Sequence, residues 1–226
     1  MCGICGFIGE VENSKAVLKR MMDKIAHRGP DDEGMYVEEH AAIGHRRLSI
    51  IDLNHGAQPM YNEKGDIAIV FNGEIYNHLD VRKELIAKGH VFANESDTEC
   101  LVHAYEEYGT DMLSKLRGMF SFVIWDSKNK TAFGARDHFG IKPFYYSQIN
   151  GSLAFSSEIK AILEFPGFKK EVNEEALEQY LSFQYSVLPE CFFKGVYKLP
   201  AGHYMIYKNG EMTVKRYFDP MMEPKE

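Results

Sequence analysis

The sequence Met1-Cys2-Gly3-Ile4-Cys5-Gly6 opens the chain, and removal of its initiator methionine would make Cys2 the first residue. A thiol and a free α-amine would then share one residue, and such an amine has an ordinary pKa of ~7.7–8.0. The amine can accept the thiol proton near neutral pH, so Cys2 is a candidate nucleophile that carries its own base. The residues from Gly3 to Gly9 alternate small and apolar, which predicts a half-buried strand with Cys2 at its end.

Cys2 and Cys5 also form a C-x-x-C pattern, which occurs in redox pairs and in halves of zinc sites. Cys100 and Cys191 stand alone, however, and no two of the nine histidines lie two, three or four residues apart. A zinc site would have to be assembled from scattered parts of the chain, so the sequence predicts no metal site. The opening residues alone leave a further alternative open, in which Cys2 is an ordinary residue at a frayed terminus.

The composition is that of a globular protein. The 226 residues are 45% hydrophobic and 26% charged, which is sufficient for one large domain or two small ones. A formal charge of −7 without long runs of one sign argues against nucleic acid or an anionic membrane as the main partner. No secretory signal and no membrane-spanning apolar run is recognisable. Together with four dispersed cysteines, these features predict a cytoplasmic protein that binds small molecules or proteins.

Periodic apolar residues predict many strands with amphipathic helices between them. Helical spacing occurs over 14–26, 77–88 and 173–183, and a capping-box pattern at Ser96-Asp97-Thr98-Glu99 begins a further helix. Strands are expected at 34–38, 41–45, 67–71, 119–126, 131–136 and 152–157, and at 195–199, 203–207 and 212–217. Arg136 and Asp137 are expected to pair with each other in the connection that follows the strand at 131–136.

Arg46 and Arg47 lie in a segment that is expected to be extended, where neighbouring side chains point to opposite faces. Only one of them can therefore face a given pocket. A guanidinium group pairs bidentately with a carboxylate, so one of the two is a candidate anchor for an acid substrate. The alternative is an arginine on the surface. His27 and Arg28, in the loop after the first helix, are either an anion site or a solvated turn.

The buried strand at 67–71 is predicted to end at Asn72-Gly73-Glu74. The amide of Asn72 and the N–H of Gly73 can aim two donors at one point, as a developing oxyanion requires. A hairpin turn is the usual meaning of Asn-Gly, but a helix is expected next and not a second strand. Asp97, in the first turn of its helix, either complements the helix dipole or holds an ammonium group in a pocket.

An ordered set of segments covers most of residues 2–165. Its members are Cys2-Gly3-Ile4, His27-Arg28-Gly29-Pro30-Asp31, Arg47-Leu48-Ser49-Ile50-Ile51-Asp52, Gln58-Pro59, Asn72-Gly73-Glu74-Ile75-Tyr76-Asn77, Ser96-Asp97-Thr98-Glu99, 136–146 and Ser156-Ser157-Glu158. The set resembles the class II glutamine amidotransferase domain, which belongs to the N-terminal nucleophile hydrolases. Within that family it most resembles the glutaminase half of glutamine-hydrolysing asparagine synthetases, through the Arg-Leu-Ser-Ile and Asn-Gly-Glu-Ile-Tyr-Asn segments.

This resemblance implies an α+β fold, a four-layer α/β/β/α sandwich of two mainly antiparallel sheets with helices outside. One glutaminase domain would cover residues 2–218. Residues 219–226, which contain two prolines and no periodicity, would begin a linker to a synthetase domain that this chain lacks. No phosphate-binding loop of the synthetase type is found in the chain, so ATP and Mg²⁺ are expected only in the absent domain and no cofactor is expected here.

The resemblance also assigns a role to each candidate residue. Cys2 matches the catalytic nucleophile, Asn72 and Gly73 match the oxyanion hole, Arg47 matches the clamp on the substrate α-carboxylate, and Glu74 and Asp97 match positions that hold the α-amino group. Arg46 has no counterpart. The implied reaction is hydrolysis of the side-chain amide of L-glutamine through a thioester, with ammonia passed to a synthetase domain or subunit that acts on an acceptor such as activated aspartate.

Two other classes of protein compete with this one. A self-processing peptidase of the same general fold is disfavoured, because such proteins release an internal nucleophile from a propeptide and here only Met1 precedes Cys2. A catalytically silent docking domain stays open, because every required side chain can be present in a protein that has not lost Met1. The sequence leaves a homodimer open as well.

Overall fold

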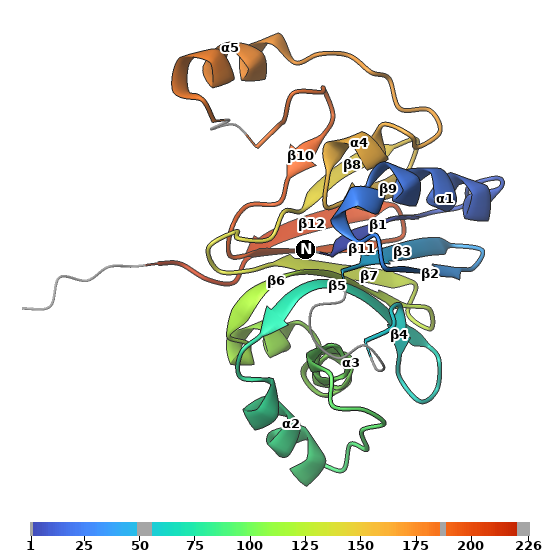
Figure 1. Ribbon diagram of the computed structural model, residues 1–226, viewed down its shortest axis with the longest axis vertical. Helices are drawn as coiled ribbons and strands as arrows, with labels where there is room; N and C mark the ends of the chain where they lie inside the picture. The colour runs from blue at the N-terminus through green and yellow to red at the C-terminus, as the bar shows by residue number, and fades with distance from the viewer. Residues whose placement is uncertain (1, 49–55, 186–188, 221–226) are drawn as a thin grey trace, which may run out of the picture.

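The computed structural model describes residues 2–48, 56–185 and 189–220, which form two antiparallel sheets that face each other (Figure 1). The first sheet has the order β10 (Tyr197–Lys198), β8 (Tyr145–Ile149), β9 (Ser152–Ser156), β1 (Gly3–Ile8), β3 (Ala41–Arg47) and β2 (Asp32–Val37). The second has the order β12 (Glu211–Arg216), β11 (His203–Lys208), β7 (Thr131–Arg136), β6 (Gly118–Asp126), β5 (Ile67–Ile75) and β4 (Met60–Tyr61).

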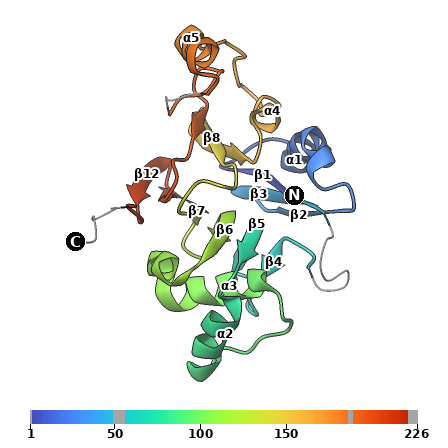
Figure 2. The same ribbon diagram turned by 60° about the vertical axis from the view of Figure 1, so that its left-hand side comes forward.

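Helices cover the outer face of each sheet, as Figure 2 shows from the side. The first sheet is covered by α1 (Ser14–Lys24) and the short α4 (Ile159–Ile162), and the second by α2 (His78–Ala87) and α3 (Asp97–Tyr108). Helix α5 (Glu174–Phe183) and the 3-10 turns η1 (Ala26–Arg28) and η2 (Gly109–Lys115) complete the described elements. The expected four-layer α/β/β/α arrangement of the α+β fold is therefore confirmed. No described helix is both long and apolar enough to cross a bilayer.

Strand β1 is central to the first sheet and is buried along its whole length. Ile4 and Ile8 pack in the core between the two sheets, whereas Cys5 and Phe7 pack in the core beneath α1. The predicted half-buried strand is thus wrong in its exposure, because helices cover the face that was expected to be exposed. The alternation itself is correct, and it separates the residues of β1 into one face toward the second sheet and one face toward α1.

Strand β5 continues further than its sequence predicts. It runs through Asn72, Gly73 and Glu74 to Ile75, and these four residues pair with β6. The predicted strand end at Asn72 is therefore wrong, because β6 is long enough to pair with the polar residues as well as with the apolar run. The hairpin turn at Asn-Gly does not form, in agreement with the helix that was expected to follow.

The connection after β7 is held by Arg136 and Asp137, but not through a pair between them. The buried Asp137 carboxylate accepts four backbone N–H groups, at 2.9–3.2 Å, from Phe120, Phe139, Ile141 and Lys142. Arg136 donates to the carbonyl oxygens of Lys142, Leu199 and Gly140. The expected ion pair is thus replaced by bonds from each charge to the backbone, since the buried N–H and C=O groups of this loop need partners.

The capping box at the start of α3 forms only in half. The Ser96 hydroxyl accepts the N–H of Glu99 at 3.2 Å, as predicted. The Glu99 carboxylate does not return to Ser96 but accepts the N–H groups of Ala93 and Asn94, at 2.6 and 2.8 Å. Ser96 N–H donates instead to Asn94 Oδ1. The Glu99 carboxylate therefore pairs with backbone N–H groups of the loop before α3 and not with the N–H of Ser96.

His45 joins the two sheets. Its imidazole is buried, and Nε2 lies 3.1 Å from the carbonyl oxygen of Phe71 on β5. Burial lowers the pKa of His45 from 6.5 to about 4, and the neighbouring Arg47 contributes in the same direction. The neutral imidazole with a proton on Nε2 donates this hydrogen bond across the gap between the sheets.

We expect the free energy of unfolding to decrease as the pH falls from about 6.5 to about 4, in part through His45. In this window the unfolded chain binds a proton that the buried imidazole does not, so protonation favours the unfolded state. The decrease in unfolding free energy contributed by His45 is zero above the pKa of this residue in the unfolded chain. It reaches about 3 kcal/mol below its pKa in the folded protein. Urea unfolding at a series of pH values measures it.

The matched variants are His45→Gln and His203→Gln. Gln at position 45 cannot titrate, so its stability should decrease less over this window than that of the parent, whereas His203→Gln should follow the parent. Equal pH slopes for His45→Gln and the parent would contradict the assignment.

Candidate active site

Cys2 lies directly before β1, and its backbone is fixed from two sides. Nε of Arg28 donates to the Cys2 carbonyl oxygen at 3.0 Å, and Arg28 in turn pairs with Glu158 at 3.1 Å. Ile4 exchanges two hydrogen bonds with Ser157, at 2.8 and 3.0 Å. The Cys2 thiol is partly exposed, with Sγ 3.9 Å from the carbonyl oxygen of Leu48. The thiol is thus presented from a rigid strand end.

Arg28 and Glu158 are not among the catalytic or substrate-binding residues that the sequence predicts. The structure excludes a merely solvated turn for Arg28, because its guanidinium anchors both Cys2 and Glu158. His27, its neighbour, contacts the same carboxylate at 2.8 Å. Arg28 and Glu158 both occur in segments that carry the family resemblance, and for Glu158 that is the only signal in the sequence.

Arg46 and Arg47 lie on opposite faces of β3, as strand alternation predicts. Arg46 faces α1, donates to the carbonyl oxygen of Met22 and pairs with Asp23 at 2.6 Å. Arg47 shares a face with His45 and is 9% exposed. Its guanidinium lies against Gly56, where an added Cβ would come within 2.7 Å of Nη2. Arg47 therefore points to the gap between the sheets and not to the outer helix.

The register of β1 and β3 brings Cys2 close to Arg47. Gly3 pairs with Arg46 and Ile4 with His45, so the next position of each strand places Cys2 opposite Arg47. Cys2 is two residues before Ile4, so its side chain points to the same face as Ile4, toward the second sheet. Directly opposed residues of an antiparallel pair have Cβ atoms about 4.5–5.5 Å apart. The thiol and the guanidinium thus face one region between the sheets.

Asn72 and Glu74 face the same gap from β5. Ala68 and Val70, which share their parity, pack in the core between the sheets, whereas Phe71 and Ile75 pack beneath α3. Asn72 is 2% exposed, and among the residues that the structure describes no acceptor contacts its Nδ2. Such a buried donor costs free energy unless a ligand pairs with it. Glu74, further along the strand, is exposed.

Gly73 directs its N–H to the open edge of β5. The N–H groups of Phe71 and Ile75 donate away from β6, to Gln58 Oε1 at 2.7 Å and to Asp97 Oδ2 at 3.0 Å. Gly73 is two residues from both Phe71 and Ile75, so its N–H points to the same edge of the strand and lies between theirs. A Cβ at Gly73 would lie 2.2 Å from the carbonyl oxygen of Met119, so no larger residue fits.

Asp97 begins α3 and lies against this edge. Its carboxylate accepts the N–H of Ile75, and burial, the largest cause, raises the pKa of Asp97 above its ordinary value of 3.8. The residue is in the first turn of the helix, so the position also suits the helix dipole. Both uses that the sequence left open are compatible with this placement.

Two further residues line the region without having been predicted. Gln58 bridges β5 to α3, because its Nε2 lies 3.4 Å from Thr98 Oγ1 while its Oε1 accepts from Phe71. Ser121 lies directly across the register from Asn72, and its buried Oγ has no partner in the described part of the chain. Only strand register could have identified Ser121. Met1, Ser49-Ile50-Ile51-Asp52 and the last six residues of the predicted linker lie outside the described residues.

The site therefore combines a partly exposed thiol, a buried guanidinium, a buried amide donor and two carboxylates along the ends of β1, β3 and β5 and the start of α3. A thiol with nearby N–H donors can attack and stabilise a carbonyl group, and opposite charges beside it can bind a zwitterion.

Several known proteins are similar to this chain in sequence. The sequence matches the glutamine amidotransferase domain over residues 1–218. It is 42% identical over 230 residues to asparagine synthetase (glutamine-hydrolyzing) 1 of Bacillus subtilis, covering 98% of this chain and 36% of that protein. It is 37% identical over 224 residues to asparagine synthetase (glutamine-hydrolyzing) 2 of Arabidopsis thaliana, covering 97% of this chain and 33% of that protein. The chain thus spans about a third of the length of these relatives.

A solved structure supports the fold independently. The glutamine phosphoribosylpyrophosphate amidotransferase of B. subtilis, solved with ADP and GMP, superposes with a TM-score of 0.69 at 20% identity. The match covers 96% of this chain and 49% of that one. At this identity the likeness concerns the fold alone, whereas the sequence match extends over nearly the whole chain. The chain therefore belongs to the glutamine amidotransferase domain family.

Proposed function

We propose that this domain hydrolyses the side-chain amide of L-glutamine with Cys2 as nucleophile, and that it supplies the ammonia to a synthetase domain or subunit. The observation that carries the proposal is the buried amide of Asn72, which faces the gap where Cys2 and Arg47 lie and which has no acceptor among the described residues. A buried donor without an acceptor among the described residues suits an oxygen that becomes charged only during reaction.

The chemistry needs no group beyond Cys2 and its donors. The free α-amine of Cys2 takes the thiol proton, and the thiolate attacks Cδ of glutamine. The carbonyl oxygen becomes an oxyanion, which the Asn72 side chain and the Gly73 N–H stabilise. The protonated amine then gives its proton to the leaving nitrogen, so that ammonia departs and a thioester stays on Sγ. Water, deprotonated by the same amine, attacks the thioester and releases glutamate.

The proposed recognition of glutamine uses both of its charges. Arg47 would hold the α-carboxylate bidentately, and Glu74 and Asp97 would hold the α-ammonium group. The placement of Arg47 supports this assignment, because its side chain is buried on the face of β3 that is turned to the gap, opposite Cys2. The contact of Asp97 with Ile75 supports a position beside Gly73, where the substrate amide would lie.

The rest of the proposal concerns the whole protein. We infer that residues 2–218 form the glutaminase domain, that 219–226 begin a linker, and that the chain itself needs no cofactor. We also infer a synthetase partner that depends on ATP and Mg²⁺ and amidates activated aspartate. The inference comes from the asparagine synthetases above, of whose length this chain spans 36% and 33%. Such a protein would work in the cytoplasm, and a homodimer is compatible with it. The competing assignment, a silent docking domain, predicts no hydrolysis at all.

Cys2→Ala should abolish glutamate release from glutamine while leaving the urea unfolding midpoint nearly unchanged, because the partly exposed thiol contributes little packing. Cys5 is the matched control. It is buried beneath α1, and burial raises the pKa of its thiol strongly, so it is not a nucleophile. Cys5→Ala should retain activity and lose stability. If the two variants lost activity equally at unchanged stability, a joint redox or metal role of the pair would replace this proposal.

Arg47→Ala should raise the KM for glutamine far more than Arg46→Ala. Loss of a bidentate pair with a carboxylate costs roughly 1.5–3 kcal/mol, or about 10–150-fold in KM. Arg46 faces Asp23 and Glu33 on the outer surface, so Arg46→Ala should change stability and leave KM near the parent value. Steady-state glutamate release measures both. Equal increases in KM would remove Arg47 from the substrate site.

Activity should depend wholly on removal of Met1. While Met1 is present, the nitrogen of Cys2 is an amide that cannot take the thiol proton, so the residue does not carry its own base. Mass spectrometry separates protein that starts at Met1 from protein that starts at Cys2, and each is then assayed for glutamate release and for labelling by a glutamine-like diazoketone. Comparable turnover by the Met1 form would show that another group is the base.

A further inference from the structure

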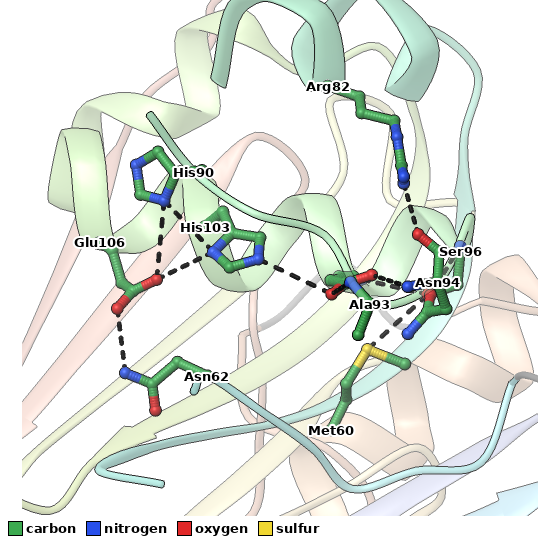
Figure 3. A network of polar contacts seen from close by, with 10 residues as sticks. Met60, Asn62, Arg82, His90, Ala93, Asn94, Ser96, His103 and Glu106 are labelled. Atoms are coloured by element: carbon green, nitrogen blue, oxygen red, sulfur yellow. Dashed lines mark hydrogen bonds and ion pairs between the residues drawn. The ribbon is translucent and has the colours of Figure 1, made fainter. Parts of the chain in front are cut away.

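Two histidines that are 13 residues apart in sequence lie side by side on the outer layer of the molecule, away from Cys2. His90 follows α2, and His103 is in the middle of α3 (Figure 3). Glu106, one turn after His103 on the same helix, points at both rings. The proposed glutaminase reaction uses none of the three.

The three side chains offer one ligand atom each to a common point. Nδ1 of His103 lies 3.3 Å from Nδ1 of His90 and 3.0 Å from Oε2 of Glu106, and the last two atoms are 3.9 Å apart. Ligands of a tetrahedral zinc ion, at bond lengths of ~2.0–2.1 Å, are about 3.3 Å from one another. The observed separations are therefore close to those of three corners of a zinc tetrahedron.

The Nε2 atoms of the two rings and the second oxygen of Glu106 also have polar neighbours. Nε2 of His103 faces Glu99 Oε1 at 3.8 Å, and Nε2 of His90 faces Glu107 Oε2 at 3.4 Å. The second oxygen of Glu106 accepts from Asn62 Nδ2 at 2.9 Å. Histidines that bind a metal usually give their other N–H to a carboxylate, and carboxylate ligands are hydrogen-bonded as well. His90 and Glu106 have such a hydrogen bond, and Glu99 lies near the outer nitrogen of His103 at a longer distance.

The carboxylates beside the two Nε2 atoms have further partners. Glu99 accepts two backbone N–H groups, at 2.6 and 2.8 Å, and Glu107 binds Lys88 Nζ at 2.6 Å. If both Nε2 atoms donate to these carboxylates, each neutral ring has a lone pair on Nδ1. Two nitrogen lone pairs and a carboxylate oxygen then face one another at 3.0–3.9 Å with no hydrogen between them. A cation at the centre makes this arrangement favourable, whereas without one a proton on Nδ1 has to bridge these atoms.

We propose that His90, His103 and Glu106 form a binding site for a divalent transition-metal ion of the zinc type, with a fourth position open to water. Imidazole and carboxylate are ligands that such ions accept, and two histidines with one glutamate leave one corner of the tetrahedron vacant. His103 is 2% exposed, whereas the side chains of His90 and Glu106 are each 17% exposed, so the ion would be reached from the surface.

The backbone presents these ligands without rearrangement. Gly89, with φ of 101°, ends α2, and the N–H groups of Gly89 and His90 return to Ile86 and Leu85 at 3.0 and 3.1 Å. This turn fixes His90, while α3 fixes the spacing of His103 and Glu106. The ion would fasten the end of α2 to α3, the helix that begins with Asp97. The prediction of no metal site considered only close spacing in sequence, and here the fold brings distant residues together.

The test uses the full chain without a histidine tag, in the Cys2→Ala form so that the free thiol does not bind metal. After chelator treatment and its removal, Zn²⁺ is titrated calorimetrically at neutral pH. We expect one equivalent at micromolar affinity or tighter and an increase in Tm, because a ligand that binds only the folded state stabilises it. Co²⁺ should give the absorption of a tetrahedral ion without a thiolate charge-transfer band.

Two variants remove ligands and one serves as the control. His90→Ala and Glu106→Gln should each weaken Zn²⁺ binding by more than about tenfold. Glu10, Glu39 and His40 form another His–carboxylate group on the surface, so His40→Ala should bind Zn²⁺ like the parent. Circular dichroism checks that each variant is folded. Failure of the parent to bind Zn²⁺ with micromolar affinity, or binding by His90→Ala and Glu106→Gln that is as tight as that of the parent, would overturn the proposal and leave hydrogen bonds among the three side chains as their only role.

Discussion

The antiparallel register of β1 and β3 is the constraint on which the site depends. Gly3 pairs with Arg46, and this single alignment directs Arg46 to α1 and Arg47 to the gap between the sheets, opposite Cys2. A slip by one residue would exchange the faces and place the other arginine beside the thiol. The register is well specified, because Ile4 and Ile43 must pack toward the second sheet while Phe7 and Ala42 pack toward the helix.

The two sheets also determine the electrostatic character of the site. Apolar side chains fill most of the gap between them, so the polar groups at its end lie in surroundings of low polarity, as the neutral imidazole of His45 indicates. In such surroundings Asn72 Nδ2 and Ser121 Oγ, both without partners in the described ranges, cost free energy. A fold optimised for stability alone would pair or replace them. Their presence is consistent with a site that is completed by its substrate.

Much of this arrangement follows from local patterns, and the remainder required long-range pairing. Alternation separated Arg46 from Arg47, and the apolar periods located most helices and strands, because each depends on neighbours along the chain. The extension of β5 to Ile75 depends on β6, and the burial of both faces of β1 depends on α1. His90 and His103 meet only because α2 and α3 pack together. The bonds of Asp137 to the loop backbone likewise involve residues that no sequence spacing indicates.

The edge of β5 has a further consequence for solubility. Beyond the short β4, this edge carries N–H groups that could pair with a strand of another molecule, which is a common start of aggregation. Side chains occupy two of these groups, since Gln58 accepts from Phe71 and Asp97 accepts from Ile75. Intermolecular strand pairing needs several successive N–H groups, and between these two only that of Gly73 is directed outward. These two side chains thereby also keep the sheet from extending into a neighbouring copy of the chain.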